Sequence, residues 1–234
     1  VADMDFKTAD PIVSALLKRV DRGIFGYAFI TEAYLNAVQG WMKRRHGYPI
    51  EHDWIVPTIG IVPALSMIVR KFSSAGEKVL IQRPVYYPFS NAIKNNDRSV
   101  LCNPLKLENN RYQMDLEDLE EKASDPDVKL MILCTPHNPV GRAWSFEDIQ
   151  KVGEICLKHQ VLLVADEIHG DLIMPGHQFH SYGLQDPKLL ENVIICTAPS
   201  KSFNLAGLKS SNLIIPNPEI RKRMKEEIKA SGLF

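Results

Sequence analysis

One lysine of the chain stands in a setting suited to chemistry. Lys201 lies within residues 200–206, which combine small, polar and aromatic side chains and follow an apolar, strand-like run at 193–197. A lysine amine attacks an aldehyde only in its unprotonated form, which burial and nearby positive charge favour. The amine released by a substrate could then serve as a general base at the substrate's Cα. The alternative for Lys201 in isolation is an ordinary surface lysine.

A carboxylate and an amide follow two other strand-like runs. Asp166 ends the apolar run at 161–165, where a buried carboxylate needs a cationic or donor partner. We prefer Asp166 to Glu167 because consecutive side chains of a strand point to opposite sides. Asn138 lies in residues 135–141, a loop shaped by two prolines and a glycine. A helix cap or ion pair for Asp166, and a plain turn for Asn138, are the alternatives.

Together these three residues indicate a pyridoxal phosphate site. Lys201 would react with the aldehyde, and Asp166 would hold the protonated ring nitrogen through a charge-assisted hydrogen bond. Asn138 would donate to the phenolic oxygen. A protonated ring is an electron sink for negative charge at the substrate's Cα.

The cofactor's phosphate is expected at the start of a helix. Gly60, Ile61 and Val62 open a helical segment, and amides at a helix N-terminus bind phosphate closely where glycine leaves room. Ser200 could add a hydroxyl group and Lys209 a positive charge. The alternatives are that Gly60 merely precedes an ordinary helix, and that Lys209 is a solvated surface lysine.

Aromatic side chains add to the candidate site. Tyr86 and Tyr87 follow a predicted strand, and an aromatic ring at this place could stack on the pyridine ring. Tyr27 and His169 are ambiguous from the sequence alone. Core packing for the tyrosines and a structural role for His169 are the alternatives.

Helical and strand-like patterns alternate along most of the chain. The pattern predicts strands at 54–56, 78–82, 100–102, 130–134, 161–165, 193–197 and 213–215. It predicts helices at about 31–45 and 60–72, and further helices that begin near residues 86, 115 and 145. An earlier helix is predicted to have Asp10 as its N-cap, Pro11 at its first position and an apolar face that includes Leu16, Leu17 and Val20. Ser145 and Asp148 resemble a capping box.

Several predicted strands are continuously apolar, which indicates a sheet covered on both faces. We therefore expect a three-layer α/β/α fold with a mainly parallel sheet. Ligands of such folds bind at the carboxyl ends of the strands. Five of the candidate residues each follow a predicted strand: Gly60, Tyr86, Asn138, Asp166 and Lys201.

The composition gives no sign of a nucleic-acid or membrane partner. The 234 residues include 28 Lys+Arg and 28 Asp+Glu, so the formal net charge is zero. No apolar run approaches the roughly 18 residues that span a bilayer. The four cysteines form no C-x-x-C pair, so we expect reduced thiols in a cytoplasmic protein and no metal site.

The order of these motifs resembles the class I/II aminotransferase family of fold-type I pyridoxal phosphate enzymes. The resemblance spans most of the chain and rests on Gly60, Tyr86 and the segments 138–141, 166–167, 200–201 and 207–209. Finer segments are similar to the C–S lyases of the cystathionine β-lyase type, namely 2–6, 23–27, 84–89, 166–169 and 197–201.

The resemblance implies a role for each candidate residue. Lys201, Asp166 and Tyr86 would be catalytic, as the aldehyde-binding lysine, the partner of the ring nitrogen and the stacking ring. Asn138 would hold the phenolic oxygen. The phosphate would be held by a larger set, namely Gly60, Ile61, Val62, Ser200 and Lys209.

Two further residues extend this assignment. Tyr27 would reach the cofactor phosphate of a partner subunit, which implies a two-fold homodimer. Many aminotransferases carry a tyrosine near the phenolic oxygen where this chain has His169, and Tyr87 would take over that role.

By the same resemblance, residues 1–30 form an N-terminal segment with dimer and active-site contacts, and residues 31–234 form the cofactor-binding large domain. Both ends of the chain look cut. The C-terminal small domain, with the arginine that clamps the substrate carboxylate, has no match in the chain.

The lyase-like segments and His169 favour a C–S β-lyase. Its substrate would be a small L-amino acid with sulfur at Cβ, and its products a thiol, pyruvate and ammonia. An aminotransferase with the same cofactor contacts is the alternative. A non-catalytic fragment or an interaction protein that retains the fold is a third possibility.

Overall fold

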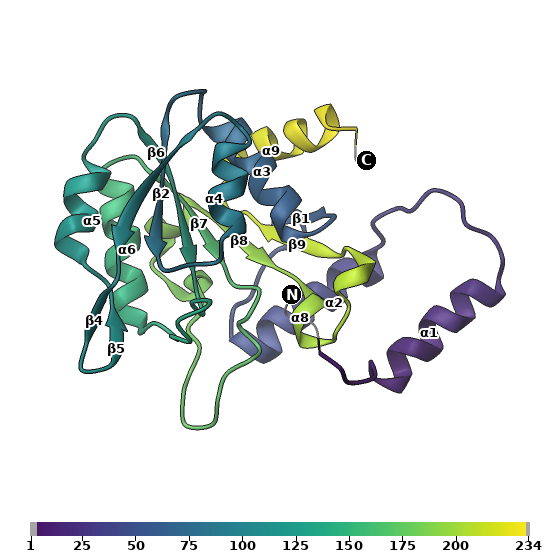
Figure 1. Ribbon diagram of the computed structural model, residues 1–234. Helices are drawn as coiled ribbons and strands as arrows, with labels where there is room; N and C mark the ends of the chain where they lie inside the picture. Colours follow the sequence, from purple (N-terminus) through teal and green to yellow (C-terminus); the bar gives the residue numbers. More distant parts are fainter. Residues whose placement is uncertain (1–3, 233–234) are drawn as a thin grey trace.

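A seven-stranded sheet forms the middle layer of the computed structural model, which describes residues 4–232 (Figure 1). Its strand order is β1-β9-β8-β7-β6-β2-β3. β9 runs antiparallel to both of its neighbours, and the other neighbouring pairs are parallel. The strands are β1 (Ile55–Thr58), β2 (Lys78–Arg83), β3 (Ser99–Pro104), β6 (Val128–Cys134), β7 (Leu162–Asp166), β8 (Val193–Thr197) and β9 (Ser211–Ile214). The predicted mainly parallel sheet is confirmed.

Helices cover both faces of this sheet, as its continuously apolar strands predict. Alternate residues of β8 face opposite layers: Val193 and Ile195 pack into one core cluster, and Ile194 and Cys196 into the other. The first cluster lies against α2 (Glu32–His46), α5 (Leu116–Ala123) and α6 (Phe146–Lys158). The second lies against α3 (Ile61–Phe72), α4 (Pro88–Lys94) and α9 (Pro218–Ala230). The three-layer α/β/α prediction is therefore confirmed.

Short elements fill the connections between these layers. A small hairpin of β4 (Lys106–Glu108) and β5 (Arg111–Gln113) lies outside the main sheet and was not predicted, because its strands have three residues each. The remaining short helices are η1 (His52–Trp54), η2 (Tyr182–Leu184), α7 (Pro187–Leu190), α8 (Pro199–Ser202) and η3 (Ala206–Leu208). Among residues 4–232, no helix combines the length and the apolar character that crossing a membrane requires.

Local sequence signals set most helix ends. The capping box of α6 is present, with Ser145 and Asp148 each bonded to the other's backbone amide. The predicted cap of α1 (Asp10–Asp21) is wrong, because Ala9 occupies the N-cap and Asp10 is already helical. Asp10 instead forms an ion pair with Lys7 at 2.6 Å.

Helix α1 lies away from the sheet at the purple end of the chain (Figure 1). Its predicted apolar face exists, but the described part of the chain leaves it exposed, with Leu17 at 63% and Val20 at 61% of full exposure. Residues 2 and 3 of the lyase-like segment 2–6 lie outside the described residues.

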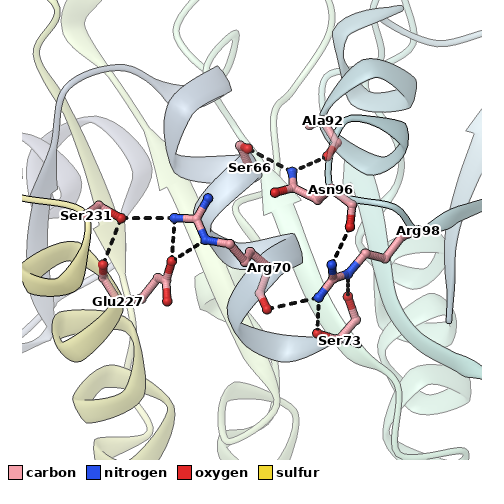
Figure 2. A network of polar contacts seen from close by, with 8 residues as sticks. All are labelled: Ser66, Arg70, Ser73, Ala92, Asn96, Arg98, Glu227 and Ser231. Atoms are coloured by element: carbon pink, nitrogen blue, oxygen red, sulfur yellow. Dashed lines mark hydrogen bonds and ion pairs between the residues drawn. The ribbon is translucent and has the colours of Figure 1, made fainter. Parts of the chain in front are cut away.

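The last helix, α9, is fixed to α3 by a polar network (Figure 2). Arg70 donates from Nε to Glu227 Oε1 at 2.6 Å and from Nη2 to Ser231 Oγ at 3.0 Å. Arg98 donates to the carbonyl oxygens of Arg70 and Ser73, which joins the start of β3 to the same helix. These exposed contacts orient α9. Most of the free energy that holds α9 on the domain comes from the burial of apolar residues on the face that points into the second core cluster.

Met224 is the test of that inner face, because its side chain is fully buried in the second core cluster. Met224→Ala should lower the free energy of unfolding by about 2–5 kcal/mol, through lost burial and the cavity left behind. Urea denaturation followed by circular dichroism measures the change. Lys225→Ala, at an exposed position of the same helix, is the control and should change stability by less than about 0.5 kcal/mol. Equal effects of the two substitutions would contradict this packing.

Candidate active site

The carboxyl ends of the parallel strands surround a cavity of about 430 Å³. Gly60 follows β1, Tyr86 follows β2, Asn138 follows β6, Asp166 ends β7 and Lys201 follows β8. All five line the cavity, together with Ile61, Val62, Tyr87, His169, Ser200 and Lys209. Tyr27 is the predicted residue that lies elsewhere, with 96% of its surface exposed.

The start of α3 offers two backbone amides to an anion. Gly60 is the N-cap with φ of +117°, a conformation that side chains rarely adopt. Its own N–H donates to Ser211 Oγ at 2.7 Å, so the amide of Gly60 is already engaged. Pro63 has no N–H, which leaves the amides of Ile61 and Val62 in the first turn without an intrahelical acceptor. Of the three predicted residues at this helix start, Ile61 and Val62 therefore have amides available to an anion, whereas Gly60 provides room.

The buried carboxylate of Asp166 is a strongly perturbed titratable group of the cavity. Its side chain accepts a hydrogen bond from the backbone N–H of Ile168 at 3.1 Å. Burial raises the pKa of Asp166 to about 7. A protonated ring nitrogen would provide the cationic partner that favours the ionised form of this carboxylate.

The neighbouring carboxylate of Glu167 is held differently. It accepts hydrogen bonds from the Tyr182 N–H at 2.6 Å and from the Ser181 hydroxyl at 2.8 Å. It lines a separate, mostly apolar cavity beside α2 and not the cavity of Lys201. The strand alternation that favoured Asp166 over Glu167 thus agrees with the observed geometry.

Two loops are joined at the side of the cavity that carries Asn138. The N–H of Tyr86 donates to the backbone oxygen of Asn138 at 2.9 Å, which fixes the tyrosine relative to the amide. Burial, Tyr87 and Asp166 raise the pKa of the Tyr86 phenol, so it stays protonated. Burial and the charge of Lys201 lower the pKa of His169, which favours a neutral imidazole.

The turn that carries Lys201 is braced by α2 and by the loop after β7. Ser202 donates to Asp171 Oδ2, while His46 Nε2 lies 3.1 Å from Asp171 Oδ1. Trp41 of α2 packs edge-on against Phe203, with ring centroids 5.1 Å apart. Ser202 and Phe203 directly follow Lys201, so these contacts limit the movement of the lysine's backbone.

The N-terminal segment is tied to the same turn. The side-chain amide of Asn204 donates to the backbone oxygens of Met4 and Phe6, at 3.0 and 2.8 Å. Asn204 itself has φ of +54°, a left-handed conformation that asparagine tolerates better than most residues. The start of the described chain therefore lies beside α8 (Figure 1).

Several lining residues were missed by the sequence analysis, namely Cys134, Ile168, Ala198, Ala206 and Ser210. Ile168 had a signal, because a residue two positions after Asp166 lies on the same side of an extended chain. Ser210 had none, since it lies between η3 and β9 with no pattern of its own.

The chain is similar to known proteins over nearly its whole length. A family model described as aminotransferase class I and II matches residues 3–230. Cystathionine beta-lyase PatB of Bacillus subtilis (strain 168) is 45% identical over 233 residues, which cover 100% of this chain and 60% of that protein.

Two solved structures are also similar. Cystalysin from Treponema denticola, whose crystal structure contains pyridoxal 5'-phosphate, is 43% identical with a TM-score of 0.96, over 98% of this chain and 58% of that one. The pyridoxal-phosphate-bound C–S lyase from Staphylococcus hominis is 33% identical with a TM-score of 0.91, over 97% and 58%. The chain thus spans about 60% of the length of PatB and slightly less of these two proteins.

Asp166 makes stability depend on pH when no cofactor is bound. Its pKa is about 7 in the folded state and roughly 3.9 in the unfolded chain. Between these values the folded state holds a proton that the unfolded state has released, so the free energy of unfolding falls as pH rises. Between about pH 4 and pH 8, the free energy of unfolding of the cofactor-free protein should fall by up to about 4 kcal/mol relative to that of Asp166→Asn. Urea denaturation across this range measures the difference.

Glu51→Gln is the control for this comparison, because Glu51 is an exposed carboxylate. Its pH profile should run parallel to that of the wild-type protein. A profile of Asp166→Asn that is also parallel to wild type would contradict the assignment of the buried proton to Asp166.

Proposed function

Because the chain belongs to the aminotransferase class I and II family, we propose that it is the cofactor-binding part of a pyridoxal-phosphate-dependent C–S β-lyase. The observation that carries the proposal is the convergence of Lys201, Asp166 and Asn138 on one cavity. The names of the similar proteins, cystathionine beta-lyase and C–S lyase, support the reaction class. The substrate is then an L-amino acid with sulfur at Cβ, and the products are a thiol, pyruvate and ammonia.

The residues of the cavity fit this cofactor. Asp166 is a buried carboxylate whose pKa is raised by burial. A pyridinium nitrogen beside it would supply the positive charge that stabilises its ionised form. The amides of Ile61 and Val62, with Ser200 and Lys209, provide donors and charge for the phosphate. When bound, the cofactor delocalises the negative charge that develops at the substrate's Cα.

Lys201 has two tasks in this reaction. Its amine would be the group that holds the cofactor through the aldehyde when no substrate is bound. It then takes the proton from Cα, and the electron pair of that bond drives the breaking of the Cβ–S bond. The sulfur leaves as a thiolate and takes up a proton, and water converts the remaining three-carbon fragment to pyruvate and ammonia. Asn138 and Tyr86 keep the reacting groups oriented meanwhile.

An aminotransferase is the second candidate, and the name of the matching family favours it. Such an enzyme would use the same cavity and would transfer the amino group to a keto acid without expelling a group from Cβ. The lyase names of PatB and of the Staphylococcus hominis structure, together with the lyase-like segments around His169, support the first candidate.

Lys201 provides the direct test. Borohydride reduction of the protein loaded with pyridoxal phosphate should fix one cofactor to Lys201, as read by peptide mass spectrometry. Lys201→Ala should abolish the label and lower the rate of pyruvate release from L-cystathionine by at least about 10³-fold, since the base is lost. Lys188→Ala, at an exposed lysine that does not line the cavity, is the control and should behave like wild type.

The same assay separates the candidates. Pyruvate and thiol from cystathionine without an added keto acid identify a lyase. Amino transfer that depends on a keto acid, without thiol release, would identify an aminotransferase. The absence of any label on the folded protein would reject both.

We also propose that the protein is a two-fold homodimer in which residues 1–30 contribute to the interface. The support is a run of exposed apolar side chains after α1: Ile24, Phe25, Tyr27 and Phe29 are 63%, 69%, 96% and 83% exposed. Exposed apolar side chains gathered in one short segment are typical of an interaction surface. In this arrangement Tyr27 reaches the phosphate of the partner's cofactor, whereas residues 31–234 form the large domain.

Charge in this patch should oppose association. Phe25→Asp combined with Phe29→Asp should shift the protein from dimer to monomer in sedimentation velocity, because two carboxylates would have to be desolvated in the interface. Lys43→Asp, an exposed change on α2, should leave the dimer intact. A dimer unaffected by the double substitution would place the interface elsewhere.

A cytoplasmic location is part of the same proposal. All four cysteines are free thiols, and three of them are buried. Unpaired cysteines are usual in reducing compartments, which supports this location.

A further inference from the structure

A second groove, of about 560 Å³, adjoins the cofactor cavity. It lies between residues 136–145 and the loop at 169–180, with Arg111 of β5 at its edge. Asn138 and His169 line both spaces, so the groove opens beside the cofactor-binding residues. Two arginines and four histidines line it, and no carboxylate of residues 4–232 does so.

Arg142 is the central cation of this groove. Its Nε donates to the backbone oxygen of Tyr112 at 2.9 Å, and its guanidinium lies over the ring of Trp144, with Cζ 5.1 Å from the centroid. These two contacts fix the side chain and use one of its five donors. Within the described chain, Arg142 forms no ion pair and its terminal nitrogens have no hydrogen-bond partner.

The electrostatic setting of Arg142 calls for an anion. The side chain is half-buried, and this burial, followed by the nearby charge of Arg111, lowers the pKa of Arg142, while the charge of Asp148 acts in the opposite direction. His137 is buried against Trp144, and burial lowers its pKa to about 4, so it is neutral at pH 7. The two arginines are thus the permanent charges of the groove. A fixed guanidinium with free terminal nitrogens matches a carboxylate through two parallel hydrogen bonds.

We propose that this groove binds a carboxylate of the amino-acid substrate through Arg142, with Arg111 in support. The inference rests on the proposed lyase function. The carboxylate has two possible sources, the α-carboxylate of the reacting amino acid and a second carboxylate on the sulfur-linked substituent. The second fits better, because the groove lies beside the cofactor cavity, where a long substituent on sulfur must extend.

Two substrates distinguish these sources. L-cystathionine carries a carboxylate on the substituent, and S-ethyl-L-cysteine does not. Arg142→Gln should raise KM for cystathionine about ten-fold or more, with kcat within about two-fold, because the lost contact is made equally before and during the reaction. The kinetic constants for S-ethyl-L-cysteine should stay within about two-fold. Arg142→Lys keeps the charge but loses the paired geometry, and should give an intermediate KM for cystathionine.

Arg223→Gln is a matched control. Arg223 also lies over an aromatic ring, that of Phe72 at 4.5 Å, and donates to a backbone oxygen, that of Lys71 at 3.2 Å. It belongs to α9 and does not line either space. Its substitution should change neither substrate's constants.

The outcomes are separable. If Arg142→Gln raises KM equally for both substrates, the groove binds the α-carboxylate. If KM and kcat are unchanged for both substrates, the proposal is overturned. If Arg142→Gln does not fold, as judged by circular dichroism, Arg111→Gln replaces it with the same expected pattern at a smaller size. A wild-type protein that releases no pyruvate from either substrate overturns the lyase function and this inference with it. Normal wild-type turnover without any dependence on Arg142 or Arg111 overturns this inference alone.

Discussion

The burial of one carboxylate is the constraint on which the site depends. Asp166 ends the central strand β7, where 4% of its surface is exposed and both faces of the sheet are covered by helices. A charge in such a place is unfavourable unless a cation meets it. A positively charged ligand bound here would therefore stabilise the ionised form of the Asp166 carboxylate. The cavity around it collects the groups that such a ligand needs, including an amine, an amide and free helix amides.

The rest of the fold holds those groups in register. The antiparallel strand β9 contributes Ser211, which engages the Gly60 amide and lies 2.7 Å from the hydroxyl of Thr58. This contact locks the start of α3 to the sheet and decides which amides remain available. On the other side of the cavity, α2 and Asp171 hold the turn that carries Lys201. The site is thus positioned by elements far from it in sequence.

The sequence predicted the strand-end residues well, because apolar runs that end in a polar residue reveal both the strand and its edge. Asp166 and Asn138 were found for that reason, and the cavity places them with Lys201. The engagement of Gly60 by Ser211 was not predictable, since the two residues are separated by 151 positions and Ser211 lies in an unremarkable strand. The same holds for Arg142, whose importance depends on what surrounds it in space. The predicted N-cap of α1 was wrong by one residue, because an aspartate before a proline is compatible both with the N-cap position and with the first position of the helix.

The hold of Asn204 on the backbone of Met4 and Phe6 has a thermodynamic consequence. It links the N-terminal segment mechanically to the turn of Lys201. If residues 1–30 join two subunits, an ordered lysine turn and an ordered interface stabilise each other. Linkage of this kind is reciprocal: the factor by which cofactor strengthens subunit association equals the factor by which association strengthens cofactor binding. Dilution alone would then release cofactor from the protein, without any change at the cavity itself.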